Sequence, residues 1–330
     1  MTDPVVIERM IDASPEEAFA LLTQPERLRR WQALSASVDL RVGGDYRMTI
    51  VPGAIAEGSY KEIEPGKRVL FTWGWAGSED VPPGSSEVLI ELEPYDGQTL
   101  VRFSHSGLDP KPAASHSEGW EHYADRLAAA AKAGDAGADP WAAAPEELDH
   151  LTAAEASWAI CQQIMRGFQG DIRNDPTPCS DFTVHELVEH LMGSLRELGG
   201  MAGAEIPTEI VADSAEDYIA QAAEATLAAW RTRGIEGEVP FGDGTAPALV
   251  PLGIIILELF IHAWDFAQAI DAEFEAPEHL TAFVQTTAGA IIQPDNRGEG
   301  RGFAAVQETP SSDPVDALMA FTGRAVPVPA

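Results

Sequence analysis

Three ionisable residues interrupt one strongly apolar stretch of the chain, Pro251–Ile270 (PLGIIILELFIHAWDFAQAI). Glu258, His262 and Asp265 stand at positions i, i+4 and i+7, so their side chains share one stripe of an α-helix. Ionisable groups are seldom buried unless they are paired or bind a metal. A carboxylate and an imidazole one turn apart can ligate a single ion. The stretch is therefore predicted to be a helix that carries half of a metal site.

A metal held by Glu258 and His262 needs at least one more protein ligand. His190 is the best candidate, because it stands at the edge of the apolar stripe of another predicted helix. His185 is the competitor, but it falls in the first turn of that helix, where a solvated side chain is expected. Two histidines and one carboxylate leave open positions on zinc, as catalytic sites do. Asp265 is expected either to orient a ligand imidazole without contacting the metal or to ligate the metal directly.

The other reactive residues lack a partner in the sequence. Cys179 stands in the loop TPCSDF without an adjacent base, so a nucleophilic role and a structural role both stay open. Cys161 falls on an apolar ridge and is expected in a core. His105, His116 and His122 fall at a strand end, in a loop and on a helix without ligand spacing, so surface or capping roles are expected rather than a second metal site. No catalytic residue is assigned, and the Glu–His spacing alone also fits an ordinary helix pair.

Length and composition narrow the class of protein. The 330 residues, 45% of them hydrophobic, indicate two domains with cores of their own. A formal net charge of −32 argues against nucleic acid and anionic membranes as partners, because both attract basic surfaces. The start MTDPVVIERM lacks a secretory pattern, and the longest apolar run, residues 246–257, is too short to span a bilayer. Since two cysteines imply no disulfide framework, a cytoplasmic protein is expected.

The first half of the chain changes from a helical to a strand pattern and back. A strand at Val5–Ile11 is followed by a helix that Ser14 and Glu17 open with a capping box. From Ser115 a helical pattern returns. In between, a period of two predicts strands, and Asp96-Gly97 is a hairpin signal between the last two. These strands are expected at Val38–Leu40, Tyr46–Val51, Gly58–Ile63, Arg68–Trp75, Glu87–Glu93 and Thr99–His105.

Three runs in this half resemble the heat-shock-protein ATPase activator homologues of the START-like (SRPBCC) superfamily: GSYKEIEPGKRVLFTWGW, VLIELEPYDGQTLVRFSHSGL and SHSEGWEHYADRLA. The resemblance covers almost all of Val5–Ala131. It implies an α+β helix-grip domain, in which a curved antiparallel sheet grips a long helix around an apolar cavity. Chaperone ATPase activation would rest on the family label alone. The aromatic residues expected either to line the cavity or to fill the core are Trp73, Trp75, Phe103, Trp120 and Tyr123.

A run of small residues, Ala128–Ala144 (AAAAKAGDAGADPWAAA), separates the two halves. The predicted domains are residues 1–133 and 146–330, joined by a linker at 134–145. Everything beyond the linker is predicted as helix, with a Gly- and Pro-rich remainder on the surface. Four helices with inward-facing ligands suggest a bundle with its site in the core. The four helices are expected at Glu146–Phe168, from Thr183 to Leu198, at Ser214–Arg231 and at Pro251–Ile270, and Pro277–Ile292 is expected to add a further helix.

The runs TPCSDFTVHELVEHL and ELFIHAWDFAQAI resemble the DinB-like superfamily, and more closely the metal-binding domain of mycothiol-dependent maleylpyruvate isomerases. The similarity extends from about Glu146 to Arg324 and includes FTGRAV. It implies an all-α DinB-like four-helix bundle with its metal on His190, Glu258 and His262. Members of the family use the metal to bind the thiolate of a low-molecular-weight thiol. The C-terminal domain of the isomerase is not matched, so the resemblance does not extend to maleylpyruvate isomerisation itself.

The sequence therefore predicts a transferase or isomerase that uses a divalent metal, expected to be zinc, and mycothiol or a similar thiol against a small electrophile. The alternative is a non-enzymatic protein that binds an apolar ligand or acts in a stress response, with a structural metal. The expected partner is a small-molecule substrate or an apolar ligand, and a homodimer is left open.

Overall fold

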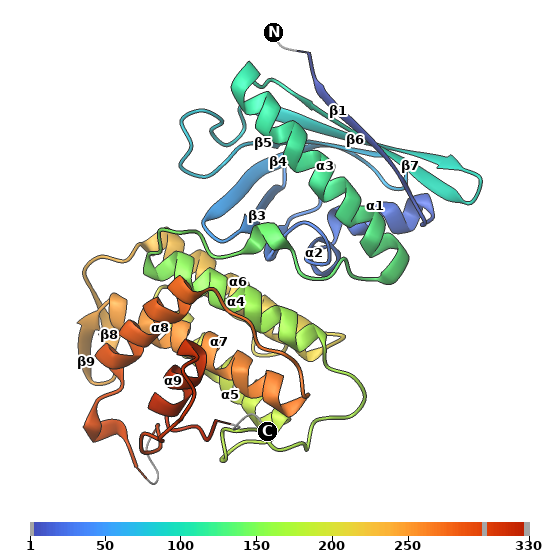
Figure 1. Cartoon of the computed structure of the whole chain (residues 1–330). Helices are drawn as coiled ribbons and strands as arrows, with labels where there is room; N and C mark the ends of the chain where they lie inside the picture. The colour runs from blue at the N-terminus through green and yellow to red at the C-terminus, as the bar shows by residue number, and fades with distance from the viewer. Residues whose placement is uncertain (1–2, 299–301, 327–330) are drawn as a thin grey trace. The chain divides into compact units, whose positions relative to one another are not determined.

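The computed structural model describes residues 3–298 and 302–326, and the chain divides into two compact units, Met1–Ala142 and Ala143–Ala330. Figure 1 shows the elements of both units, and each unit has its own hydrophobic core. The predicted linker, residues 134–145, lies across this division. Its first part packs on the first unit, where Arg126 donates hydrogen bonds to the carbonyl oxygens of Gly137 and Ala138 at 2.8 and 3.0 Å.

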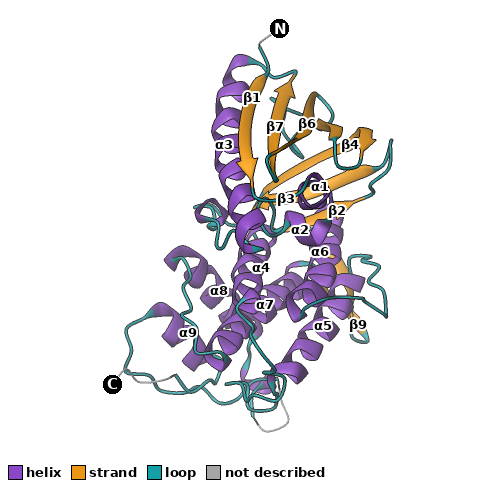
Figure 2. Ribbon diagram, turned by 90° about the vertical axis from the view of Figure 1, so that its right-hand side faces the viewer, coloured by secondary structure: helices purple, strands orange, loops and turns teal. Residues whose placement is uncertain are grey.

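The first unit is built on a seven-stranded antiparallel sheet with the strand order β1-β7-β6-β5-β4-β3-β2. A long helix, α3, runs along one face of this sheet (Figure 2), as the helix-grip arrangement requires. The helix-grip fold predicted for this half is thereby confirmed. The strands are β1 (Val5–Ile11), β2 (Ser35–Val38), β3 (Asp45–Val51), β4 (Ala54–Glu64), β5 (Arg68–Trp73), β6 (Ser86–Tyr95) and β7 (Gln98–Ser106). The helices are α1 (Pro15–Thr23), α2 (Pro25–Leu28), α3 (Pro110–Ala133) and the 3-10 turn η1 (Pro140–Ala142).

Local signals in the sequence explain where these elements begin and turn. The Ser14 hydroxyl accepts from the Glu17 backbone N–H, and the Glu17 carboxylate accepts from the Ser14 N–H, which completes the predicted capping box of α1. Asp96 and Gly97 both have positive φ, 48° and 81°, and form the tight turn between β6 and β7. Helix α3 begins at Pro110, so His116 lies on a helix and its placement in a loop was wrong.

The second unit is mostly helical, and α7 lies in its core against α4, α5 and α8 (Figure 1). The helices are α4 (His150–Arg166), α5 (Val184–Gly200), α6 (Ala215–Arg233), α7 (Leu249–Ala269), α8 (Glu278–Ile291), α9 (Pro314–Phe321) and the 3-10 turn η2 (Pro294–Asn296). By length and composition alone α7 could cross a membrane, but 78% of its most apolar window is buried inside the protein. A buried core helix of a globular unit meets the same criterion.

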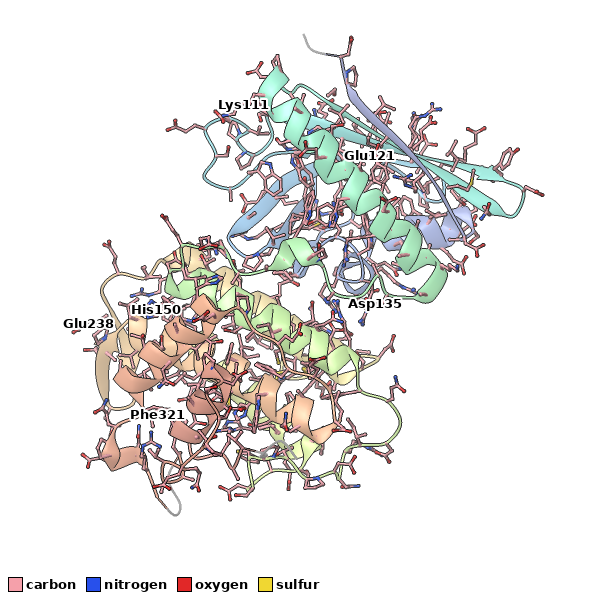
Figure 3. The ribbon with its side chains drawn as sticks, viewed as in Figure 1. Lys111, Glu121, Asp135, His150, Glu238 and Phe321 are labelled. Carbon is pink, nitrogen blue, oxygen red and sulfur yellow. The ribbon has the colours of Figure 1, made fainter. Side chains whose placement is uncertain are left out.

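A hairpin and a helix of this unit correct the sequence prediction. The unit is not all-α, because β8 (Glu238–Phe241) and β9 (Gly244–Pro247) form an antiparallel hairpin around Gly242, whose φ is positive. Helix α9 lies in the Gly- and Pro-rich remainder that was expected only to wrap the surface. Asp313 caps α9 through the Val315 N–H at 2.7 Å. Figure 3 labels Phe321, the last residue of this helix.

Candidate metal centre

Two helices of the second unit bring the three predicted ligands together. His190 comes from α5, and Glu258 and His262 come from successive turns of α7. One ligand atom from each of the three residues can be chosen so that all lie within 4.8 Å of one another. The apolar stripe of α5 is buried on both sides of His190, at Leu187 and Leu191, and holds this helix against the core. The site is therefore fixed by core packing rather than by a loop.

The Glu258 carboxylate lies between the two imidazoles. Its Oε2 atom is 3.1 Å from His190 Nε2 and 3.4 Å from His262 Nε2. Within the described residues, neither contact has the direction of a hydrogen bond, and Oε2 is buried without a hydrogen-bond partner. A buried carboxylate oxygen without such a partner is costly. Two imidazole nitrogens and one carboxylate oxygen at this spacing fit a divalent ion of the zinc type.

A buried ion pair between Asp265 and Arg324 contacts the Nδ1 side of the His262 ring. Asp265 is fully buried, and its Oδ2 atom lies 2.9 Å from His262 Nδ1. Arg324 donates two hydrogen bonds to the Asp265 carboxylate, Nε to Oδ1 at 2.8 Å and Nη2 to Oδ2 at 2.6 Å. A hydrogen bond at Nδ1 fixes the imidazole orientation and leaves Nε2 for the metal, as in many zinc sites. Asp265 therefore contacts the predicted ligand His262 and is not itself a member of the cluster of His190, Glu258 and His262.

Sequence reasoning did not assign a role to Arg324. The only signal was its place in the run FTGRAV, far along the chain from the other site residues. A buried carboxylate such as Asp265 requires a cationic or hydrogen-bonding partner. That requirement predicts that a partner exists but does not say which arginine supplies it.

Neighbouring charges shift the pKa values of the ionisable side chains in and beside the ligand cluster. Burial alone would raise the pKa of Glu258, but the two imidazoles beside its carboxylate, of His190 and His262, hold it well below the usual range. Burial alone would lower the pKa of His262, yet Asp265 and Glu258 raise it to about 9. Burial likewise opposes ionisation of Asp265, whose pKa is nevertheless lowered by Arg324 and His262. Without a metal, His262 therefore carries a proton at neutral pH, and an incoming ion must displace it.

The loop before α5 covers one side of the site. Phe182 stacks on the His190 ring at a centroid distance of 4.9 Å, and the His190 and His262 rings meet nearly at right angles. The Thr177 hydroxyl lies within hydrogen-bond distance of the carbonyl oxygens of Cys179 and Phe182, which stabilises the loop. The His190 side chain is 35% exposed against 8% for His262, so solvent reaches the site from the α5 side.

The remaining candidates stay outside the ligand cluster. His185 is exposed in the first turn of α5. Cys179 is half-buried, and burial raises the pKa of its thiol to about 11 although Arg324 opposes the shift. This cysteine is therefore a protonated thiol rather than an activated nucleophile. Cys161 is fully buried on α4.

A cavity of about 210 Å³ lies in the first unit, bordered by α3 and the sheet. Trp73, Trp75, Trp120 and Tyr123, expected either to line a cavity or to fill the core, are among its lining residues, and three of them also belong to the hydrophobic core. Phe103 is not among the lining residues and stacks on Trp120 at a centroid distance of 5.2 Å. The three histidines of this unit do not form a ligand cluster within residues 3–142. His105 and His116 bond to tryptophans, and His122 bonds to Asp139.

Comparison with known proteins identifies the first unit. Residues 12–132 match the family described as activator of Hsp90 ATPase homolog 1-like protein. The first unit contains an AHSA1-like domain. An AHSA1-like protein from Rhizobium etli is 40% identical, covering 46% of this chain and 96% of its own, with a TM-score of 0.36. The Aha1 dimer from Colwellia psychrerythraea is 26% identical, covering 41% of this chain and 98% of its own, also with a TM-score of 0.36.

A second comparison reaches beyond the AHSA1-like domain. Uncharacterized proteins from two strains of Mycobacterium tuberculosis are 29% identical over 185 residues, which is 54% of this chain and 100% of theirs. Because this match is longer than the first unit, it includes part of the helical unit.

Proposed function

We propose that the second unit is a DinB-like metal-binding domain of an enzyme that joins a low-molecular-weight thiol, of the mycothiol type, to a small electrophile. The observation that carries the proposal is the buried Oε2 atom of Glu258, which lies between two histidine Nε2 atoms without a hydrogen bond. When bound, a divalent ion, zinc first among the candidates, supplies the positive charge that lowers the pKa of a thiol and keeps it ionised.

The residues of the chain have separate tasks in this proposal. His190, Glu258 and His262 hold the ion with one atom each, and three protein ligands leave room for a thiol. Asp265 accepts the Nδ1 proton of His262 and so directs the lone pair of Nε2 toward the ligand cluster. The exposed side of His190 is where thiol and electrophile enter.

Metal content decides whether the site exists. We expect near-stoichiometric zinc by mass spectrometry on purified wild-type protein and its loss in His190→Ala, Glu258→Ala and His262→Ala. His185→Ala is the matched control, because it removes an exposed histidine from the same helix and should leave the metal content unchanged. If wild-type protein soaked in zinc, cobalt and manganese retains none of them, the proposal fails.

Thiol chemistry decides what the site does. Metal-loaded protein is incubated with 1-chloro-2,4-dinitrobenzene and either mycothiol, glutathione or N-acetylcysteine, and loss of free thiol is followed. We expect one thiol to be consumed faster with metal-loaded protein than with the Glu258→Ala variant. If metal binds in stoichiometric amount but no thiol is consumed faster, the metal is structural and the enzymatic proposal is wrong.

Binding of an apolar ligand is a second candidate function, and it belongs to the first unit. The observation that favours it is the cavity beside α3, which is lined mainly by aromatic side chains. An engineered apolar cavity of about 150 Å³ in another protein admits benzene, so a space of this size can hold a larger ring system. This function does not depend on the metal.

A further inference from the structure

The cavity of the first unit is aromatic and carries no charged side chain. Four indole rings border it, from Trp73, Trp75, Trp120 and Trp141. No Asp, Glu, Lys or Arg is found among its lining residues. Because a charge transferred into such a space would lose its hydration without gaining a partner, the cavity selects neutral molecules.

The hydrogen bonds of His105 exclude catalysis by the neighbouring serine. The Trp120 Nε1–H donates to His105 Nδ1 at 3.0 Å, and an indole N–H can only donate, so Nδ1 carries no proton. The proton of the neutral ring is therefore on Nε2 and points to Ser86 Oγ at 2.9 Å. Ser86 in turn donates to the Trp73 carbonyl oxygen at 3.1 Å. Neither ring nitrogen of His105 is available to accept the proton of the Ser86 hydroxyl. His105 therefore cannot act as a general base that activates Ser86 as a nucleophile.

His116 is fixed in the same way at the cavity wall. Its Nε2 accepts from the Trp75 Nε1–H at 3.0 Å, and its Nδ1 donates to the Pro112 carbonyl oxygen at 2.8 Å. Both ring nitrogens are therefore used within the protein. Burial lowers the pKa of this ring as well, so it stays neutral. His116 offers a ligand only its flat face.

Gln32 is a polar lining residue whose side-chain amide is free to pair with a ligand. It follows α2 and is only 6% exposed, and its side-chain amide makes no hydrogen bond with any described residue. An amide can donate and accept at once. Two other lining groups, the Trp73 Nε1–H and the Tyr123 hydroxyl, are buried without a hydrogen-bond partner in the described chain. Unpaired buried polar groups are costly, and a ligand that pairs with them recovers that cost.

We propose that this cavity binds a neutral, fused two-ring aromatic molecule that carries a carbonyl and an N–H side by side, as in a lactam, and that Gln32 recognises this polar edge. The Gln32 amide donates to the carbonyl and accepts from the N–H, and the indole rings stack on the ring faces. The proposal rests on ligand binding by the first unit. It adds the class of ligand and the residue that selects it.

Two probes of nearly equal shape test the proposal on the full-length protein. Quinolin-2(1H)-one has the lactam edge, and naphthalene lacks it. Dissociation constants are measured from tryptophan fluorescence and indole N–H chemical shifts for wild type, Gln32→Leu and Gln98→Leu. We expect Gln32→Leu to weaken quinolinone binding about tenfold and to leave naphthalene binding unchanged or tighter. Gln98→Leu, at an exposed position on β7, should change neither.

The outcomes separate the selection by Gln32 from ligand binding itself. If naphthalene binds and Gln32→Leu changes both probes equally or neither, the role of Gln32 is overturned while ligand binding stands. If neither probe binds the wild-type protein at its solubility limit, ligand binding by the cavity fails as well. Should Gln32→Leu fold poorly, Trp73→Phe keeps a smaller aromatic ring at this position and removes the indole N–H, and a loss of quinolinone affinity larger than that of naphthalene is expected there too.

Discussion

At the scale of single residues, the candidate metal centre combines groups that are costly to bury alone. Asp265 has no exposure to solvent and would be unfavourable without Arg324 and His262. Its two carboxylate oxygens accept from Arg324, and one also contacts His262. The orientation of a metal ligand on α7 thus depends on an arginine beyond α9. This dependence can be measured.

Replacing Arg324 by methionine is expected to weaken zinc binding about 10- to 100-fold, because loss of a group behind a metal-bound histidine has effects of this size. Chelator competition measures the affinity. Arg297→Met is the control, since Arg297 packs over the Phe321 ring at 4.6 Å and loosens the same region without contacting Asp265. Equal zinc affinity in wild type and Arg324→Met would show that Asp265 orients His262 without the arginine.

Zinc binding is expected to become weaker as the pH falls. The pKa of His262 is raised to about 9 in the metal-free fold, so below that pH an ion must displace one proton. The apparent affinity should therefore decrease about tenfold per pH unit between about pH 9 and pH 7, and level off above 9. Titrations with a zinc indicator in several buffers measure this slope. A pH-independent affinity over this range would mean that His262 is already neutral before zinc arrives.

At the scale of helices and strands, the sequence predicted best where one periodicity dominates. Alternating residues such as Val88 and Ile90 predicted β6, and the spacing of Glu258 and His262 predicted both the α7 helix and its ligands. The hairpin β8–β9 was missed because each of its strands has four residues, too few to show a period of two. Gln32 was missed because a lone glutamine carries no pattern, and only the fold shows that it lacks a partner.

The capping box of α5 gives a test at this scale. The Thr183 hydroxyl accepts from the Glu186 backbone N–H, and the Glu186 carboxylate accepts from the Thr183 N–H at 2.9 Å. Thr183→Ala should cost about 1 kcal/mol in the unfolding free energy of the second unit. Ser14→Ala removes the corresponding cap of α1 and should affect the first unit instead. Hydrogen exchange read by mass spectrometry assigns each loss to its unit, and a loss spread over both units by either variant would contradict the prediction.

At the scale of the whole molecule, the two units have separate cores, and each core contains a buried histidine. The pKa values of these two histidines are shifted in opposite directions. Burial lowers the pKa of His105 in the first unit to about 3, whereas that of His262 in the second unit is raised. A buried neutral histidine favours the unfolded state at low pH, because only the unfolded chain binds the proton. A protonated, paired histidine has the reverse effect. The metal-free units should therefore respond differently to mild acid at these positions.

The first unit is expected to lose stability as the pH falls from about 6.5 toward 3. Between these values the unfolded state binds a proton that His105 in the folded state does not, which costs about 1.4 kcal/mol per pH unit. Urea unfolding at several pH values measures the slope. His105→Gln should reduce it, and His185→Gln, exposed on α5, should leave it unchanged. An identical slope in wild type and His105→Gln would assign the acid sensitivity to other groups.

Separate cores also predict separate ligand effects. All buried members of one core come from residues 7–130 and those of the other from residues 151–319. A ligand that binds only the folded form stabilises the unit that holds its site, by about 2.7 kcal/mol at 100 times its dissociation constant. Zinc should therefore slow hydrogen exchange only in the second unit and quinolinone only in the first. Protection of both units by either ligand would mean that they fold as one cooperative body, and each site would then report on the other.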